Sequence, residues 1–130
     1  MLKVKMNLLY PVKVHKLSEG LKLTSSEFNL SVTDTSLMEA VAKMKESILA
    51  KLAKMQEEQQ EPPLPKHNDF NESATVFIEI ESASLKFFCE RVNVSIPKNL
   101  LSIVDSKVKN RSNYISNLIL QDLLKNNTTL

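Results

Sequence analysis

The sequence predicts an α+β protein in two parts: an antiparallel sheet with one long packed helix, and a C-terminal unit of one strand and two helices. Three features of the 130-residue chain predict this class. Apolar and polar residues alternate in several segments before residue 34, as they do in strands. A helical apolar period follows, and a proline-rich stretch then separates it from further strand-like segments. The length suits one domain or two small ones.

The N-terminal segments have the alternation of an antiparallel meander. Residues 2–14 alternate, and Pro11 marks a break or an edge position in this strand. Ser18-Glu19-Gly20 predicts a turn. Residues 21–23 and 28–32 alternate again, so we expect further strands that pair antiparallel with the first.

Ser36 and Glu39 have the spacing of a capping box, which predicts the start of a long helix. The apolar positions of this helix recur at steps of three and four residues: Leu37, Val41, Met44, Ile48, Leu52 and Met55. Three further apolar residues widen this stripe: Met38, Leu49 and Ala53. We expect the apolar stripe to pack on one face of the meander.

Proline ends this helix, because Pro62-Pro63-Leu64-Pro65 cannot continue it, and a proline-rich loop is predicted over residues 57–73. Thr75–Ile80 has strong strand character, and we expect it to join the same sheet. We place a first domain at residues 1–81 and a second at residues 82–130. The second begins with an apolar cluster: Leu85, Phe87 and Phe88.

Polar and apolar side chains also alternate from Arg91 to Pro97. One face of this predicted strand holds three hydrogen-bonding side chains: Arg91, Asn93 and Ser95. The other face is apolar: Val92, Val94 and Ile96. Pro97 suits the first turn of a helix, and a basic segment from Lys109 to Ser112 joins that helix to another. A strand followed by two helices is the layout of a ribbon-helix-helix module, whose paired strands suit the DNA major groove.

Both predicted helices of this unit have an apolar stripe. The first stripe contains Leu100, Leu101, Val104 and Val108, and the second contains Tyr114, Ile115, Leu118, Ile119 and Leu123. A unit of about 40 residues rarely buries enough apolar surface to fold alone. We therefore expect a homodimer through this C-terminal domain, and a tetramer if the N-terminal half also self-associates.

The polar side chains of the C-terminal unit match the chemistry of DNA recognition. Arg can donate to guanine, Asn can serve adenine and Ser can serve either base, so Arg91, Asn93 and Ser95 are the candidates for base readout. Ser112 is a good N-cap for the second helix, whose N-terminus suits a phosphate. The candidate phosphate contacts are Lys109, Arg111, Ser112 and Asn113. Residues 90–130 carry six Lys or Arg and three Asp or Glu, a charge of +3 per copy.

Catalytic and metal-binding patterns are weak. His15 and His67 have no metal-ligand spacing with each other or with Cys89, which we expect to be a buried structural thiol. A single Gly cannot supply a glycine-rich phosphate loop. We expect no enzyme, no metal and no cofactor. One cysteine, no long apolar segment and a lysine-alternating start favour a bacterial cytoplasmic protein without membrane contact.

Four stretches resemble one known family: Leu9-Tyr10-Pro11-Val12, residues 34–40, residues 62–65, and Arg91 to Pro97 with Asn110-Arg111-Ser112. They are similar to the HicB antitoxins that end in a ribbon-helix-helix domain. The resemblance implies a partial RNase H-like fold in the N-terminal half, without nuclease activity. It also implies a partner toxin, HicA, a small ribonuclease that cleaves mRNA. Residues 25–30 depart from the family pattern, because they lack its Pro-Asp-Leu-Pro-Gly-like turn.

The family resemblance thus favours an antitoxin that blocks a HicA-like toxin with its N-terminal half and represses the shared operon with its C-terminal half. Base readout at Arg91, Asn93 and Ser95 carries over from the same match. Two alternatives remain open. One is a stand-alone transcriptional regulator whose N-terminal half only oligomerises, and the other is an interaction protein whose C-terminal unit only dimerises.

Overall fold

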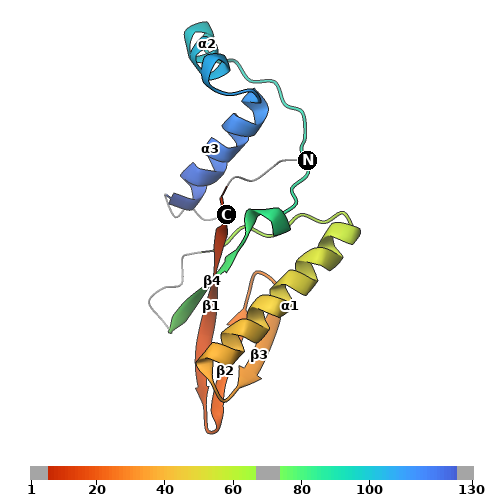
Figure 1. Ribbon diagram of the computed structural model, residues 1–130, viewed down its shortest axis with the longest axis vertical. Helices are drawn as coiled ribbons and strands as arrows, with labels where there is room; N and C mark the ends of the chain where they lie inside the picture. Colours follow the sequence, from red (N-terminus) through yellow and green to blue (C-terminus); the bar gives the residue numbers. More distant parts are fainter. Residues whose placement is uncertain (1–5, 67–73, 126–130) are drawn as a thin grey trace.

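Four antiparallel strands and one long helix form the larger part of the computed structural model, which describes residues 6–66 and 74–125 (Figure 1). The strands are β1 (Leu8–Leu17), β2 (Gly20–Ser25), β3 (Leu30–Asp34) and β4 (Thr75–Ile80). They lie in the order β3-β2-β1-β4, and each pairs antiparallel with its neighbour. The predicted meander is confirmed, and so is the prediction that the strand after the proline-rich loop joins the same sheet.

Strand β1 runs without a break through Pro11, so of the two predicted alternatives, a break or an edge position, the edge position is confirmed. β1 pairs with β4 from Leu8 to Lys13 and with β2 from Lys13 to Leu17. Pro11 therefore lies in the half of β1 that pairs with β4 on one side, outside the stretch from Lys13 to Leu17 that pairs with β2 on the other. A residue without an N–H is tolerated at such an edge position, because no ladder hydrogen bond is lost there.

The turn before β2 depends on Gly20, as the sequence predicts. Gly20 has φ +101°, and a Cβ there would overlap the backbone carbonyl of Asp34 on the neighbouring strand β3. The following turn differs from the prediction of a strand over residues 28–32, because β3 begins only at Leu30. Phe28 lies in the turn with its side chain buried, and Lys51 of the long helix donates to its carbonyl at 2.7 Å.

Helix α1 (Leu37–Glu57) begins where the sequence predicts, with Ser36 as its N-cap. The Ser36 Oγ accepts a hydrogen bond from the Glu39 backbone N–H at 3.5 Å. Four residues on one side of α1 are buried: Ala40, Met44, Ile48 and Leu52. Leu37 and Met38, both assigned to the apolar stripe, are instead exposed. Leu37 lies in the first turn of α1, and Met38 lies on another side of the helix from the buried residues. The apolar period therefore predicts the buried face but overstates its length and width.

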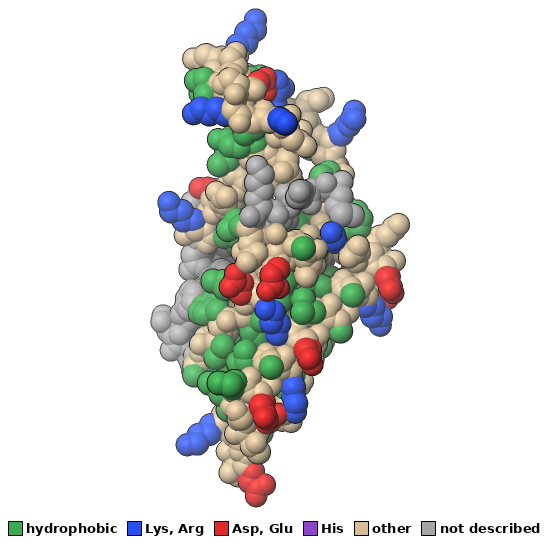
Figure 2. All heavy atoms as spheres, in the orientation of Figure 1, with side chains coloured by type: hydrophobic (Ala, Val, Ile, Leu, Met, Phe, Trp, Pro, Cys, Tyr) green, Lys and Arg blue, Asp and Glu red, His purple; other side chains and the backbone are tan. Residues whose placement is uncertain are grey.

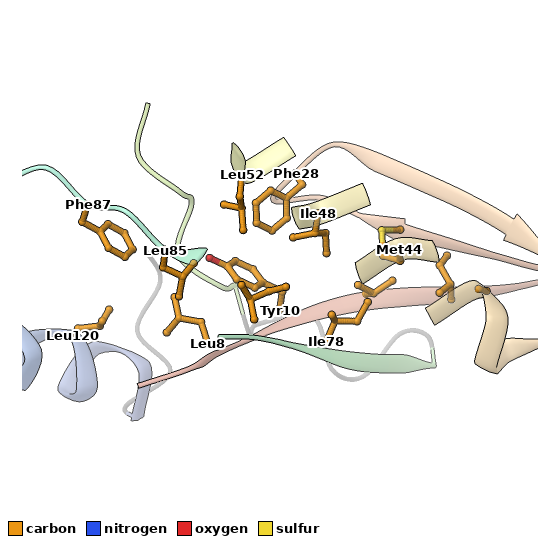
Figure 3. Packing of buried hydrophobic residues seen from close by; sticks show 14 residues of the cluster. Leu8, Tyr10, Phe28, Met44, Ile48, Leu52, Ile78, Leu85, Phe87 and Leu120 are labelled. Atoms are coloured by element: carbon orange, nitrogen blue, oxygen red, sulfur yellow. The ribbon is translucent and has the colours of Figure 1, made fainter. Parts of the chain in front are cut away.

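The core lies between the sheet and α1 (Figure 3) and is centred on alternate residues of β1. Leu8, Tyr10 and Val12 are fully buried, as alternation predicts. The Tyr10 ring packs against Phe28 at 4.8 Å between centroids, and its hydroxyl donates to the Pro63 carbonyl at 2.6 Å. Burial, assisted by the nearby Glu27 carboxylate, raises the pKa of the Tyr10 hydroxyl, which therefore stays protonated and donates this hydrogen bond.

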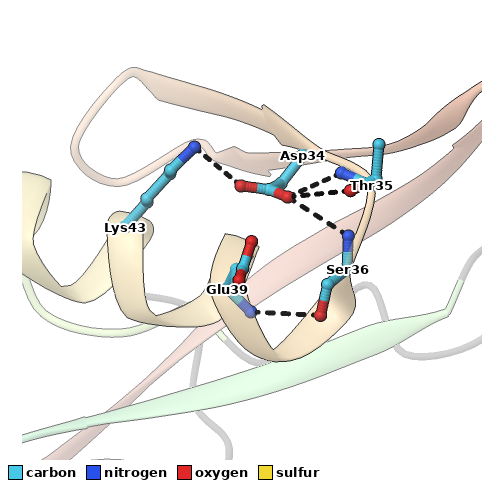
Figure 4. Close-up of polar contacts among 5 residues, drawn as sticks. All are labelled: Asp34, Thr35, Ser36, Glu39 and Lys43. Carbon is cyan, nitrogen blue, oxygen red and sulfur yellow. Dashed lines mark hydrogen bonds and ion pairs between the residues drawn. The ribbon is translucent and has the colours of Figure 1, made fainter.

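Asp34 connects the end of β3 to the start of α1 (Figure 4). Its Oδ1 accepts from the backbone N–H groups of Thr35 at 2.7 Å and Ser36 at 3.2 Å, and its Oδ2 contacts Lys43 Nζ at 2.6 Å. The hydrogen bond from Lys43 and those from the backbone lower the pKa of Asp34. Asp34 therefore satisfies the Ser36 N–H that the Glu39 side chain would satisfy in a complete capping box.

The C-terminal part begins with a short 3₁₀ turn, η1 (Ser82–Ser84), and ends in two helices, α2 (Lys98–Lys107) and α3 (Arg111–Lys125). Figure 1 shows these two helices at the opposite end of the molecule from the β1–β2 turn, joined to η1 by a long connecting segment. Within the described residues, no helix is both long and apolar enough to cross a bilayer.

We expect the Asp34 network to make stability depend on pH. A carboxylate whose pKa is lowered by folding stabilises the folded state above its ordinary pKa of about 4, and this contribution is lost as the pH falls through and below that value. Asp34→Asn should therefore lower the unfolding midpoint at pH 7, and the difference from wild type should shrink on acidification. Denaturant unfolding between about pH 7 and pH 2.5 measures this. Glu46→Gln, an exposed α1 carboxylate outside the network, is the control, and a pH-independent difference for Asp34→Asn would contradict the assignment.

Candidate nucleic-acid interface

Residues 91–97, predicted as a strand, belong to no strand or helix among the described residues. Arg91, Asn93 and Ser95, the predicted base-reading residues, are all exposed. Their apolar neighbours are equally open, since Val92 is 74% exposed and Val94 is 70% exposed. An alternating segment with both faces in solvent lacks the pairing and packing that would make it a strand. Among the described residues of this single chain, no strand pairs with residues 91–97.

The two helices that follow also leave large apolar side chains in solvent. Leu100 and Ile103 of α2 are about half exposed, as are Leu118 and Ile119 of α3. No residue of α2 is buried. The start of α2 agrees with the prediction to within one residue, since Pro97 is the N-cap of α2 and Lys98 is its first residue. The predicted amphipathic helices therefore form, but their apolar faces are only partly covered within one chain.

The turn between α2 and α3 is capped by Asn110, so the prediction of Ser112 as the N-cap is wrong. Asn110 Oδ1 accepts the Asn113 backbone N–H at 2.9 Å, and α3 already begins at Arg111. Asn is as good an N-cap as Ser, and its position three residues before the bonded N–H fits the capping geometry. Ser112 thus occupies the first turn of α3, where it is exposed.

Arg111, a predicted phosphate contact, is already engaged within the chain. Its Nε and Nη2 donate to the two carboxylate oxygens of Asp105 at 3.0 and 2.6 Å. This hydrogen-bonded ion pair lowers the pKa of Asp105 and raises that of Arg111. Because Asp105 belongs to α2 and Arg111 to α3, the pair connects the two helices across their turn. Sequence reasoning missed Asp105, although its charge and its place one turn before a basic connection were visible signals.

Two other predicted phosphate contacts flank the same helix start. Lys109 lies in the turn and is exposed. Asn113 is half-buried, and its carbonyl accepts a hydrogen bond from the Asn117 side chain at 2.8 Å. The structure therefore brings Lys109, Arg111, Ser112 and Asn113 together around the N-terminus of α3, where the backbone N–H groups point away from the helix.

Helix α3 also packs against the rest of the chain, through Leu120 (Figure 3). Leu120 is 7% exposed and belongs to the core cluster that contains Leu8, Leu85 and Phe87. Of the apolar cluster identified in the sequence, Leu85 and Phe87 are buried, whereas Phe88 is 40% exposed. The Phe88 backbone N–H donates to the Glu61 carboxylate at 2.8 Å. Leu120 lies outside the apolar stripe predicted for this helix.

Cys89 is exposed, so the prediction of a buried structural thiol is wrong. The aromatic pair before it suggested burial, but only Phe87 of that pair points into the core, and the chain then continues in solvent. In residues 6–66 and 74–125, no three His, Cys, Asp or Glu residues cluster as metal ligands would. His15 contacts Thr24 Oγ1 at 3.1 Å through Nε2, and His67 lies outside the described residues.

Basic side chains gather over the end of the molecule formed by α2 and α3, as Figure 2 shows for one face. Acidic side chains on that face lie mainly over α1 and the sheet. This distribution agrees with the charge of +3 over residues 90–130. A basic surface next to a helix N-terminus can hold phosphates.

Comparisons with known proteins show which family this chain resembles. The family model described as the HicB-like antitoxin of bacterial toxin-antitoxin systems matches residues 10–122. The crystal structure of antitoxin HicB3 superposes with a TM-score of 0.60 at 17% identity, over 89% of this chain and 98% of that one. The antitoxin HicB of Burkholderia pseudomallei gives 0.53 at 19% identity, with the same coverage. These two likenesses show the fold.

A comparison with curated protein sequences found no match. Because the family model spans most of the chain, this protein belongs to the HicB-like antitoxins of bacterial toxin-antitoxin systems.

Proposed function

We propose that this antitoxin neutralises a small HicA-like, mRNA-cleaving toxin and represses its own operon as a ribbon-helix-helix dimer bound to DNA. Residues 1–81 would form the toxin-binding domain and residues 82–130 the DNA-binding domain. The observation that carries the DNA-binding part is the open C-terminal unit. Its polar residues, basic turn and uncovered apolar faces occur in the order that a ribbon-helix-helix module requires.

The uncovered apolar side chains support a dimer. Val92 and Val94 lie on one side of the predicted strand, and α2 and α3 each add two further exposed apolar residues. A second copy could pair its own residues 91–97 with these and cover both helices at once. The pairing would satisfy the backbone hydrogen bonds of residues 91–97 and remove these apolar side chains from water.

Helix α3 can join a dimer without leaving its own chain. At 100° per residue, the half-buried Asn113, the buried Asn117 and Leu120, and the partly buried Leu124 share one face. Leu118 and Ile119 lie toward the opposite side of the helix and are 47% and 56% exposed. One face of α3 is therefore used for packing within the chain, and the other remains available to a second copy.

Base readout would then fall to Arg91, Asn93 and Ser95. In a paired ribbon their side chains would share the face opposite Val92 and Val94, so both copies could present them to the major groove. All three are exposed in the single chain. Arg91 has the donor geometry for guanine and Asn93 that for adenine, so together they can distinguish base pairs.

Phosphate contact would fall to the N-terminus of α3. Lys109 and Ser112 are exposed there, and Asn113 lies in the same helical turn. Arg111 would bind a phosphate only by exchanging its Asp105 partner, or by sharing its remaining N–H groups. The pair is about half exposed on both sides, and such surface ion pairs contribute little stability, so the exchange is feasible.

The sheet and α1 would bind and neutralise the toxin. They belong to the fold that this chain shares with the two HicB structures. Co-expression with the product of the adjacent gene tests this. We expect a complex that survives size-exclusion chromatography and an mRNA-cleavage activity that disappears at stoichiometric antitoxin. The separate residues 82–130 should bind operator DNA yet leave the toxin active. No complex and no inhibition would instead favour the stand-alone regulator, whose DNA binding needs no toxin.

Replacing Arg91, Asn93 and Ser95 together by Ala should remove sequence preference. We expect specific binding to the upstream DNA to weaken by about 1–3 kcal/mol for each lost base contact, while binding to a scrambled duplex falls less. Fluorescence anisotropy across a salt series measures both affinities. The double variant Lys54→Ala with Gln56→Ala on α1 is the control, because it loses the same positive charge outside residues 82–130. Equal losses on both duplexes would show that the three residues do not read bases.

Leu118→Asp should reduce self-association. A carboxylate in the dimer interface is costly because it loses hydration without gaining a partner, so we expect the assembly to halve in size at micromolar concentration. Sedimentation velocity measures the mass. Leu37→Asp changes a residue of α1 that is 45% exposed, against 47% for Leu118, and should leave the mass unchanged. A Leu118→Asp variant with the wild-type mass would remove α3 from the proposed interface.

A further inference from the structure

A cavity of about 410 Å³ lies on the sheet, on the face opposite α1. Lys13 pairs in register with Thr24 on one side and Thr75 on the other, and Thr24 pairs with Ser31. Paired residues of an antiparallel sheet share a face, and Lys13 follows the buried Val12. Side chains from all four strands therefore meet at the cavity, on the side of the sheet turned away from the core.

The remaining wall comes from the β2–β3 turn and from Lys66. Glu27, which does not line the cavity, holds these two segments together. Its Oε1 accepts from the Ser26 hydroxyl at 3.0 Å, and its Oε2 accepts from the Lys66 backbone N–H at 3.0 Å. Glu27 directly follows the lining residue Ser26 in sequence, and both oxygens of its carboxylate are already hydrogen-bonded. These bonds fix the β2–β3 turn relative to Lys66.

The lining is polar and positively charged. Ten described residues line the cavity, and none of them is Asp or Glu. Five carry hydroxyl groups, two are lysines, one is Asn29, and Pro11 and Leu30 supply an apolar edge. Lysine ammonium groups bind phosphate oxygens as point charges, and hydroxyl and amide groups hydrogen-bond sugar-like polar atoms.

We propose that this cavity binds a phosphorylated small molecule with a hydroxylated body, such as a sugar phosphate or a nucleoside monophosphate. The phosphate would lie between Lys13 and Lys66, with the hydroxylated body toward Thr24, Ser31 and Asn29. The volume is within the range of about 300–1,000 Å³ that small-molecule sites occupy. Lys13 and Thr75 already have partners within the chain, and the Thr24 hydroxyl contacts His15, so the ligand would share or displace those contacts.

Calorimetric titration of the full chain with AMP, ribose 5-phosphate, inorganic phosphate and adenosine tests the proposal. We expect saturable binding of AMP or ribose 5-phosphate, weaker binding of inorganic phosphate, and none of adenosine. Binding of both esters would identify the sugar phosphate as the recognised part, and binding of AMP alone would identify a nucleotide. No toxin or DNA is present, so the result is independent of the proposed function.

Two variants locate the site. Lys13→Met and Lys66→Met should each weaken binding of the phosphate ester by about tenfold or more, since each removes a charge-assisted contact. Lys22→Met changes a lysine of β2 that does not line the cavity, and it should leave the affinity unchanged. Thermal unfolding confirms that each variant is folded, and Lys66, an exposed loop residue, keeps the test valid if Lys13→Met is unstable. Adenosine binding as tightly as AMP, equal affinity in all three variants, or no binding at millimolar ligand would each overturn the proposal.

Discussion

Burial of one face of β1 connects the parts of this molecule. Leu8, Tyr10 and Val12 lie beneath α1, and β1 pairs with β4 and β2 along its two halves. The Tyr10 hydroxyl donates to Pro63, so the proline-rich loop is held against the same strand. Leu8 shares its cluster with Leu85, Phe87 and Leu120, which brings α3 to the end of the core. A buried hydrogen-bonded Tyr is costly to replace, because removing its hydroxyl leaves the Pro63 carbonyl without this donor.

The N-terminal sheet and helix bury their apolar residues within one copy, whereas the C-terminal unit leaves many of its own exposed. The sheet and α1 cover each other, so the alternating residues of β1 and the stripe of α1 are buried within one copy. Residues 91–97 and α2 have the same kind of pattern but no cover, and Val92, Val94, Leu100 and Ile103 stay in solvent. Such exposure is expected of a surface that is completed by association. The likeness in pattern and the contrast in burial together motivate the proposed dimer.

Polar contacts set the ends of the helices and thereby the geometry of the proposed interface. Asp34 fixes the start of α1 through two backbone N–H groups and Lys43. Asn110 caps α3, and the Asp105–Arg111 pair holds α3 against the end of α2. The N-terminus of α3 therefore has a defined direction relative to α2. For the phosphate contact proposed there, a preformed site loses less conformational entropy on binding than a flexible one.

The sequence by itself determined the meander, the long helix, its Ser36 cap and the two C-terminal helices, because each depends on local periodicity, proline and capping chemistry. It did not determine which residues of α3 pack within the chain, since Leu120 and Asn117 are buried by segments distant in sequence. Three further features arise only when separate elements meet: the exposure of Cys89, the ion pair between Arg111 and Asp105, and the cavity beside Lys13. Tertiary structure decided these points, because burial and partner choice depend on neighbours that no local pattern specifies.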